Sequence, residues 1–232
     1  MITFFSGTPG SGKSLHTAER IYWWLKMGKP CVCNFAINLE RIKSRKPLRF
    51  TYVDNENLTP DYLISYADGY IREKGRVKEG SLLLVIDECQ LLFNARDWGH
   101  KRRNEWLKFF TMHRHLGYDI ILVAQFDRMI DRQIRSLIEY EYKHRKVSNF
   151  GWRGKLISLF ALGNLFVSVK MWYPLKEKVG SDFFRAKKVY YSLYDTYVMF
   201  DSVKDGTPAR SAPGTQGGGR GDGTPPLSAG DA

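Results

Sequence analysis

Residues 1–15 read MITFFSGTPGSGKSL, and this segment carries the strongest signal of the fold class. The apolar run from Ile2 to Ser6 predicts a short buried parallel strand that ends at a glycine. The eight residues that follow match the pattern G-x-x-x-x-G-K-[ST] at every fixed position. Residues 13–27 then read as a helix that Gly28 and Pro30 bring to an end. Strand, glycine-rich loop and helix in this order predict a phosphate-binding loop, the P-loop.

The P-loop is expected to hold a nucleoside triphosphate through backbone N–H groups that turn toward the phosphates. It consists of Gly7, Thr8, Pro9, Gly10, Ser11, Gly12, Lys13 and Ser14. We expect the Lys13 ammonium to reach the β and γ phosphates and the Ser14 hydroxyl to ligate Mg²⁺. ATP and Mg²⁺ are therefore the expected cofactors, and no sequence pattern separates ATP from GTP. The alternative, a glycine-rich turn that never meets a nucleotide, is disfavoured by the flanking strand and helix.

A second group of polar residues follows two other predicted strands. Residues 82–88, LLLVIDE, form an apolar strand that ends in two carboxylates. Asp87 is expected to hold the Mg²⁺ shell through water, and Glu88 to polarise the attacking water as general base. The strand predicted at 119–124 delivers Gln125 to the rim where ligands bind in open α/β sheets. Gln125 is a candidate for orienting the water or sensing the γ phosphate, or it simply begins a loop.

Four arginines between the acid pair and Gln125 are candidates for an arginine finger that acts across a subunit boundary. They are Arg96, Arg102, Arg103 and Arg114. The sequence does not select one of them, and a solvated basic face explains each of them individually.

Strands that alternate with helices predict an α/β fold, a P-loop NTPase with a mainly parallel sheet flanked by helices. Further strands are predicted at 31–35, 49–53, 81–87 and 119–124, and helices at 104–115 and 127–137. After residue 139 the pattern becomes β-rich, with strands predicted at 139–147, 165–173 and 189–197. These strands either extend the sheet antiparallel at one edge or form a small added lobe.

The domain organisation follows from composition. We expect one ATPase domain over residues 1–204, with 139–200 as its β-rich extension, and a disordered Gly/Pro-rich tail over 205–232. The longest apolar stretch, 156–169, is interrupted by Gly163 and Asn164 and is shorter than the ~20 apolar residues that span a bilayer. A core strand with its turn is the favoured interpretation, and a re-entrant or interfacial membrane piece is the alternative.

Charge favours anionic partners. The chain has 36 basic and 24 acidic residues, a net charge of +12, which attracts phosphate-rich partners or anionic lipid. Basic and aromatic residues mix over 142–155, which suits single-stranded nucleic acid or anionic lipid, or equally the wet face of an edge strand. That mix consists of Tyr142, Lys143, His144, Arg145, Lys146, Phe150, Trp152, Arg153 and Lys155. Three cysteines and a start that lacks secretory order favour a reducing cytoplasm.

The chain resembles the zonular occludens toxin (Zot) family in three stretches: GTPGSGKS at 7–14, LLLVIDE at 82–88 and RDWGHKRRNEWLKFFTMHRHLGYDIILVAQ at 96–125. The likeness runs from Met1 to about Tyr197. The family includes the gene I assembly proteins of filamentous phages and is similar, more distantly, to DNA-pumping ATPases of the FtsK and HerA type. The specific part is the acid pair, the Arg-, Trp- and His-rich helix and the strand that ends in glutamine.

The resemblance implies an ATP-hydrolysing motor that assembles and exports filamentous phage through the host envelope. It assigns Lys13 and Ser14 to nucleotide and Mg²⁺, Asp87 and Glu88 to hydrolysis, and Gln125 to sensing. It further implies a homo-oligomer in the host cytoplasm, peripheral to the inner face of the inner membrane, with phage coat or assembly proteins and a host inner-membrane protein as partners. Many members continue into a membrane-spanning helix and an outer domain. We therefore expect either a subunit recruited to a membrane partner or a remainder encoded elsewhere.

Two other functions stay open at this point. One is an ATPase that grips and translocates DNA itself, which would bind DNA with a steep salt dependence. The other is a nucleotide-gated scaffold that binds ATP, barely hydrolyses it and recruits coat or host membrane proteins.

Overall fold

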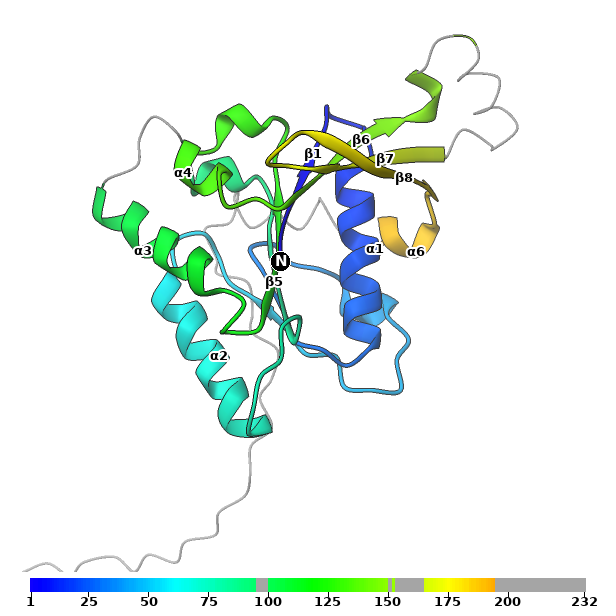
Figure 1. Cartoon of the computed structure of the whole chain (residues 1–232). Helices are drawn as coiled ribbons and strands as arrows, with labels where there is room; N and C mark the ends of the chain where they lie inside the picture. Colours follow the sequence, from blue (N-terminus) through cyan, green and yellow to red (C-terminus); the bar gives the residue numbers. More distant parts are fainter. Residues whose placement is uncertain (95–99, 150–151, 153–164, 195–232) are drawn as a thin grey trace, which may run out of the picture.

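A computed structural model describes residues 1–94, 100–149, 152 and 165–194 of the chain (Figure 1). In this part, eight strands form one sheet in the order β3-β2-β4-β5-β1-β6-β7-β8. Their bounds are β1 Ile2–Ser6, β2 Cys31–Cys33, β3 Phe50–Tyr52, β4 Leu82–Ile86, β5 Tyr118–Val123, β6 Tyr140–Lys146, β7 Leu165–Trp172 and β8 Glu177–Arg185. All pairs from β3 to β6 are parallel, whereas β7 and β8 are antiparallel additions. The predicted mainly parallel α/β sheet with a β-rich extension is confirmed.

Helices cover both faces of the sheet, with α1 and α6 on one face and α2, α3 and α4 on the other (Figure 1). Their bounds are α1 Lys13–Lys26, α2 Pro60–Lys74, α3 His100–Met112, α4 Arg132–Arg135 and α6 Lys188–Tyr191. Successive side chains of a strand point to opposite faces, so Phe4 enters one core and Phe5 the other. Because both faces are covered, the central strands are continuous apolar runs, which is why they were predictable.

The strand order brings the predicted site residues together at the carboxyl ends of the central strands. β5 lies between β1 and β4, with Phe5 opposite Val123 and Ile86 opposite Leu122. All three strands are parallel, so the residues that follow them emerge at the same end. The P-loop, Gln125 and the acid pair are therefore neighbours although they are far apart in sequence.

Two predicted elements differ from the structure. The strand predicted at 189–197 is wrong over its described part, because residues 188–191 form α6. Tyr190 and Leu193, three residues apart, are both buried in the core of the α1 face, as helical spacing allows. The helix predicted at 127–137 is interrupted by Ile130, which is extended and forms a β-bridge with Asn94.

Two elements were not predicted. α2 has the side chain of Thr59 as its N-cap, a proline at its first position and Gly75 in the left-handed conformation at its end, all readable signals. β8 forms the outer edge of the antiparallel addition. The apolar stretch 156–169 lies outside the described residues except for its end in β7, and the tail over 205–232 lies wholly outside them. In the part of the chain that is described, no helix is long and apolar enough to cross a bilayer.

Candidate functional site

The P-loop turns tightly between β1 and α1 because two of its glycines adopt conformations closed to other residues. Gly7 has φ +145°, and a Cβ there would lie 2.7 Å from the backbone oxygen of His144. Gly12 has φ +97°, and a Cβ there would lie 2.6 Å from the Phe166 ring on β7. Both positions therefore require glycine, and the loop backbone is fixed against β6 and β7.

The loop has free groups that suit a phosphate. α1 begins after Gly12 with no side-chain cap and no acidic residue in its first turn, so its first N–H groups favour an anion. The Ser11 hydroxyl is buried and has no hydrogen-bond partner among the described residues. The Lys13 amine donates to the carbonyl oxygens of Gly7 at 2.7 Å and Thr8 at 3.3 Å, which folds it over the loop. These residues fit a bound triphosphate.

Asp87 is held in position by a residue from the neighbouring strand. The Asn34 side chain accepts a hydrogen bond from the Asp87 backbone N–H at 2.7 Å and donates to the Asp87 carbonyl oxygen at 2.8 Å. Asn34 lies just after β2 and is only 7% exposed. Its carboxamide thus satisfies the backbone of Asp87 where β4 ends, and it fixes the direction in which the carboxylate points.

The Asp87 carboxylate is half-buried near the P-loop lysine. Burial raises the pKa of Asp87, and hydrogen bonds from Tyr194 and from the backbone N–H of Glu88 oppose that rise. Partial burial lowers the pKa of Lys13, and attraction to Glu88 and Asp87 works the other way. The lysine and both carboxylates therefore interact electrostatically, as the prediction that they share one site requires.

Glu88 has a backbone conformation that few residues adopt. Its φ and ψ are both 46°, in the left-handed region that costs a non-glycine residue about 1–2 kcal/mol. The Asp87 carboxylate accepts from the Glu88 N–H at 2.9 Å, and the Glu88 carbonyl accepts from Leu91 N–H at 2.8 Å. The side chain is exposed and accepts from the Gln90 amide at 2.5 Å. Strain of this kind is concentrated at functional positions, which supports the predicted role of Glu88.

Gln125 adjoins the P-loop directly. Its carbonyl oxygen accepts from the Gly7 N–H at 3.2 Å, and its half-exposed side chain lines a hollow beside Gly7 and Thr8. Exposed Lys143 and Arg145 of β6 line the same hollow. The sequence placed these two cations in a basic stretch without linking them to the P-loop. The link arises because β6 pairs with β1 in parallel, with Lys143 opposite Ser6.

The edge-strand interpretation of the basic stretch is wrong. β6 lies between β1 and β7, so both of its sides are paired. His144 is buried, with its Nδ1 3.1 Å from the carbonyl oxygen of Ser6 and its Nε2 2.8 Å from His16 Nδ1. His144 therefore packs against the residues that precede and follow the P-loop. Only part of the basic stretch 142–155 is exposed to partners. Phe150, Arg153 and Lys155 lie outside the described residues.

The candidate finger arginines separate into two ends of α3. The chain passes from the end of β4 to the start of β5 through α3, so exposed Arg102 lies toward the P-loop end of the strands. Arg103 is 3.5 Å from the Asp131 carboxylate. Arg114 follows α3 at the opposite end and binds Glu139 at 2.5 Å and Glu79 at 3.4 Å. Arg96 lies outside the described residues.

A cavity larger than the hollows beside the P-loop lies away from this site. It runs along α1 and is lined by apolar and aromatic side chains that include Trp23, Met27 and Phe183. Ligand sites often occupy large pockets, but the described lining of this one contains no P-loop residue and does not supply the convergent donors that a triphosphate requires. We therefore assign the nucleotide to the smaller hollows at the carboxyl ends of the strands.

Comparison with known proteins agrees with this geometry. The family described as "Zonular occludens toxin (Zot)" matches residues 1–199, which is most of the chain. This chain belongs to the Zot family. The resemblance noted in the sequence is thereby confirmed, and the P-loop, acid pair and Gln125 all fall inside the matched region.

Individual relatives extend the comparison. The Gene 1 protein of Enterobacteria phage M13 is 28% identical over 219 residues, which cover 88% of this chain and 61% of that protein. The Gene 1 protein of Escherichia phage If1 is 43% identical over 135 residues, covering 56% of this chain and 37% of that protein. The crystal structure of the N-terminal domain of zonular occludens toxin from Neisseria meningitidis aligns with a TM-score of 0.53 at 20% identity, covering 84% and 98% of the two chains. This chain thus spans about three fifths of the M13 relative.

Proposed function

We propose that this Zot-family chain binds and hydrolyses ATP and thereby drives assembly and export of filamentous phage particles through the host envelope. The observation that carries the proposal is the convergence of Lys13, Asp87 and Glu88 at one edge of the sheet. Family membership and the similarity to the gene I proteins of filamentous phages support the assembly role.

Each residue has a chemical task in this proposal. The P-loop N–H groups and the Lys13 ammonium hold the β and γ phosphates and offset the charge that develops on them. Ser14 and Asp87 would hold Mg²⁺, which supplies charge neutralisation between those phosphates when bound. Glu88 takes a proton from the attacking water, and Gln125 orients that water or senses the γ phosphate.

The cellular setting is part of the same proposal. We place the chain in the host cytoplasm against the inner face of the inner membrane, as a homo-oligomer that contacts coat or assembly proteins and a host membrane protein. Exposed Lys143 and Arg145 beside the P-loop supply positive charge for single-stranded DNA or anionic lipid. Because Lys143 and Arg145 adjoin the P-loop, a nucleic acid bound there would lie close to the nucleotide. The alternative of direct DNA translocation rests on this proximity.

ATPase turnover of the purified chain tests the proposal. Wild type is compared with Lys13→Ala and with Lys26→Ala, a matched control at the other end of α1. Each is measured alone, with single-stranded DNA and with anionic liposomes. We expect Lys13→Ala to lose nucleotide binding and turnover while Lys26→Ala keeps both. Turnover that survives Lys13→Ala would reject the site, and DNA stimulation that falls steeply with salt would favour the DNA-translocating alternative.

A further inference from the structure

The residues that follow α6 reach into the candidate magnesium site. The segment Lys187–Tyr194, here the closing segment, packs on α1 and on the turn after β2. The Tyr190 ring lies 5.5 Å from the Tyr22 ring, and the carbonyl oxygen of buried Leu193 accepts from the Asn38 N–H at 3.2 Å. The Tyr194 ring packs on Phe35 at 4.7 Å between centroids. The position of the Tyr194 hydroxyl is therefore set by several contacts.

That hydroxyl contacts one predicted Mg²⁺ ligand and lies near the other. It donates a hydrogen bond to the Asp87 carboxylate, and the Ser14 hydroxyl lies nearby. Ser14 follows the P-loop lysine and Asp87 follows β4, so Tyr194 lies where the two halves of the site meet. No feature of the sequence predicted this, because Tyr194 is distant from both residues along the chain.

A phenol oxygen in this place competes with a magnesium ion. Mg²⁺ takes its ligands at about 2.0–2.1 Å in a near-ideal octahedron and keeps several of its waters. An ion bound by Ser14 and, through water, by Asp87 needs the Asp87 carboxylate as an acceptor, and the Tyr194 hydroxyl already donates to that carboxylate. A half-buried carboxylate also needs a donor or a cation, and the phenol supplies a donor.

We propose, on the basis of the proposed ATPase function, that the Tyr194 hydroxyl competes with Mg²⁺ for the Asp87 carboxylate and that Mg²⁺-nucleotide must displace it. Tyr194 is then a positioning residue that links the metal site to the closing segment. Tyr191 of the same segment lines the hollow beside Ser11 and Ser14, so displacement also opens the space around the P-loop. Binding of the metal–nucleotide complex thereby releases the closing segment from the rim of the site.

The first test compares ADP affinity with Mg²⁺ and with EDTA in the full chain. The ratio of the two dissociation constants measures how much Mg²⁺ strengthens binding. Tyr194→Phe keeps the ring on Phe35 and removes only the competing hydroxyl, so we expect the ratio to rise about tenfold or more, where tenfold is about 1.4 kcal/mol. Tyr190→Phe is the matched control, since it removes a hydroxyl from the same segment, and its ratio should equal that of wild type. An unchanged or smaller ratio in Tyr194→Phe overturns the proposal.

The same data separate the two proposals. If wild type shows no Mg²⁺-dependent ADP binding, or if Lys13→Ala keeps it, the ATPase function fails first. If wild type binds and Tyr194→Phe behaves like wild type, only the role of Tyr194 fails.

The second test needs no variant. Lys187 and Lys188 are exposed trypsin sites at the start of the closing segment, and Arg76 is an exposed reference site after α2. With a non-hydrolysable ATP analogue, adding Mg²⁺ in place of EDTA should speed cleavage after Lys187 and Lys188 relative to Arg76. Relative cleavage that stays constant or slows would overturn the proposal.

Discussion

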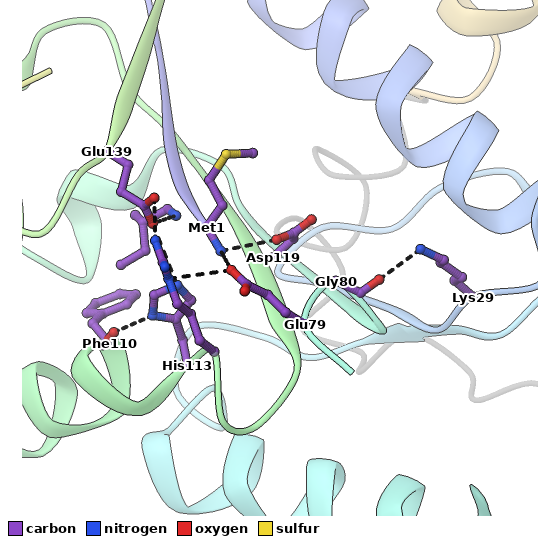
Figure 2. A network of polar contacts seen from close by, with 10 residues as sticks. Met1, Lys29, Glu79, Gly80, Phe110, His113, Asp119 and Glu139 are labelled. Atoms are coloured by element: carbon purple, nitrogen blue, oxygen red, sulfur yellow. Dashed lines mark hydrogen bonds and ion pairs between the residues drawn. The ribbon is translucent and has the colours of Figure 1, made fainter. Parts of the chain in front are cut away.

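The two ends of the parallel strands are built on opposite principles. At the amino ends, charged groups are paired with each other: Arg114 binds Glu79 and Glu139, and Glu139 also accepts from the Ile2 N–H at 3.1 Å. Figure 2 shows this network, with Glu139, Glu79 and His113 gathered near Met1. At the carboxyl ends, Glu88 has a left-handed backbone conformation, and the buried Ser11 hydroxyl has no partner among the described residues.

The two ends therefore contribute differently to folding stability and to ligand binding. Paired groups at the amino ends stabilise the fold without needing a ligand. Unpaired donors and strained residues at the carboxyl ends lower stability in the free protein, and they become favourable only when a charged ligand arrives. Mutations at the carboxyl ends should therefore reduce activity more than stability, and those at the amino ends should do the reverse.

Glu88→Gln gives the largest effect on the activity side of this comparison. Loss of a general base typically lowers the rate 10²–10⁴-fold, so we expect turnover to fall at least about 100-fold. The side chain is exposed, so the melting temperature should change little. Steady-state ATPase assays and thermal melts measure both quantities, with exposed Glu105→Gln of α3 as control. Unchanged turnover would favour the nucleotide-gated scaffold over the motor.

Acid titration probes one residue from each end, His144 and Glu139, in different pH windows. His144 packs against the start of the P-loop, at the carboxyl ends. Burial lowers its pKa to about 4, against about 6.5 in the unfolded chain. Its contribution to stability is complete above pH 6.5 and is lost as the pH falls toward 4, by roughly 3 kcal/mol. For Glu139, burial would raise the pKa, but the Arg114 hydrogen bond and others hold it below its usual value, so its contribution is lost only below about pH 4.5.

Urea unfolding at a series of pH values measures this prediction. Between pH 6.5 and 4.5 the free energy of unfolding should fall in wild type and fall less in His144→Gln, which cannot titrate. Parallel curves for the two proteins would show that His144 is not held neutral by the fold.

The sequence predicted local features, such as loops and strands, far better than contacts between segments that are distant along the chain. The P-loop, the acid pair and the central strands each carry their signal within a few residues, since glycine spacing and apolar runs reflect local geometry. Asn34 and Tyr194 reach Asp87 from distant segments, so no local pattern marks them. Residues 189–197 are rich in Val and Tyr, which favour strands, but tertiary packing on α1 overrides that preference in α6.

Asn34→Ala tests a carboxyl-end residue that should behave like one from the amino ends. It leaves the buried N–H and C=O of Asp87 without their partner, which costs about 2 kcal/mol of stability. The carboxylate also loses its fixed direction, so turnover should fall as well. The matched variant Asn55→Ala removes only a side-chain acceptor of Asn34, at 2.9 Å, and should cost less in both assays. Equal effects of the two variants would contradict the role of the two Asn34 hydrogen bonds in positioning Asp87.

Arg114→Gln should have the smallest effect, and it decides between the two ends for a candidate finger. The guanidinium is 52% exposed, so solvent screens its pairs with Glu79 and Glu139 and the loss of stability should be about 0.5–1 kcal/mol. Because those carboxylates already neutralise it at the amino ends, ATPase turnover should stay within about twofold of wild type. Arg102→Gln, exposed at the start of α3 toward the P-loop, is the matched comparison measured at the same protein concentrations. If Arg102 is the finger, Arg102→Gln should lose turnover with unchanged stability. A large loss of turnover in Arg114→Gln would mean that a neighbouring subunit uses the amino ends for catalysis, and the division between the two ends would then be wrong.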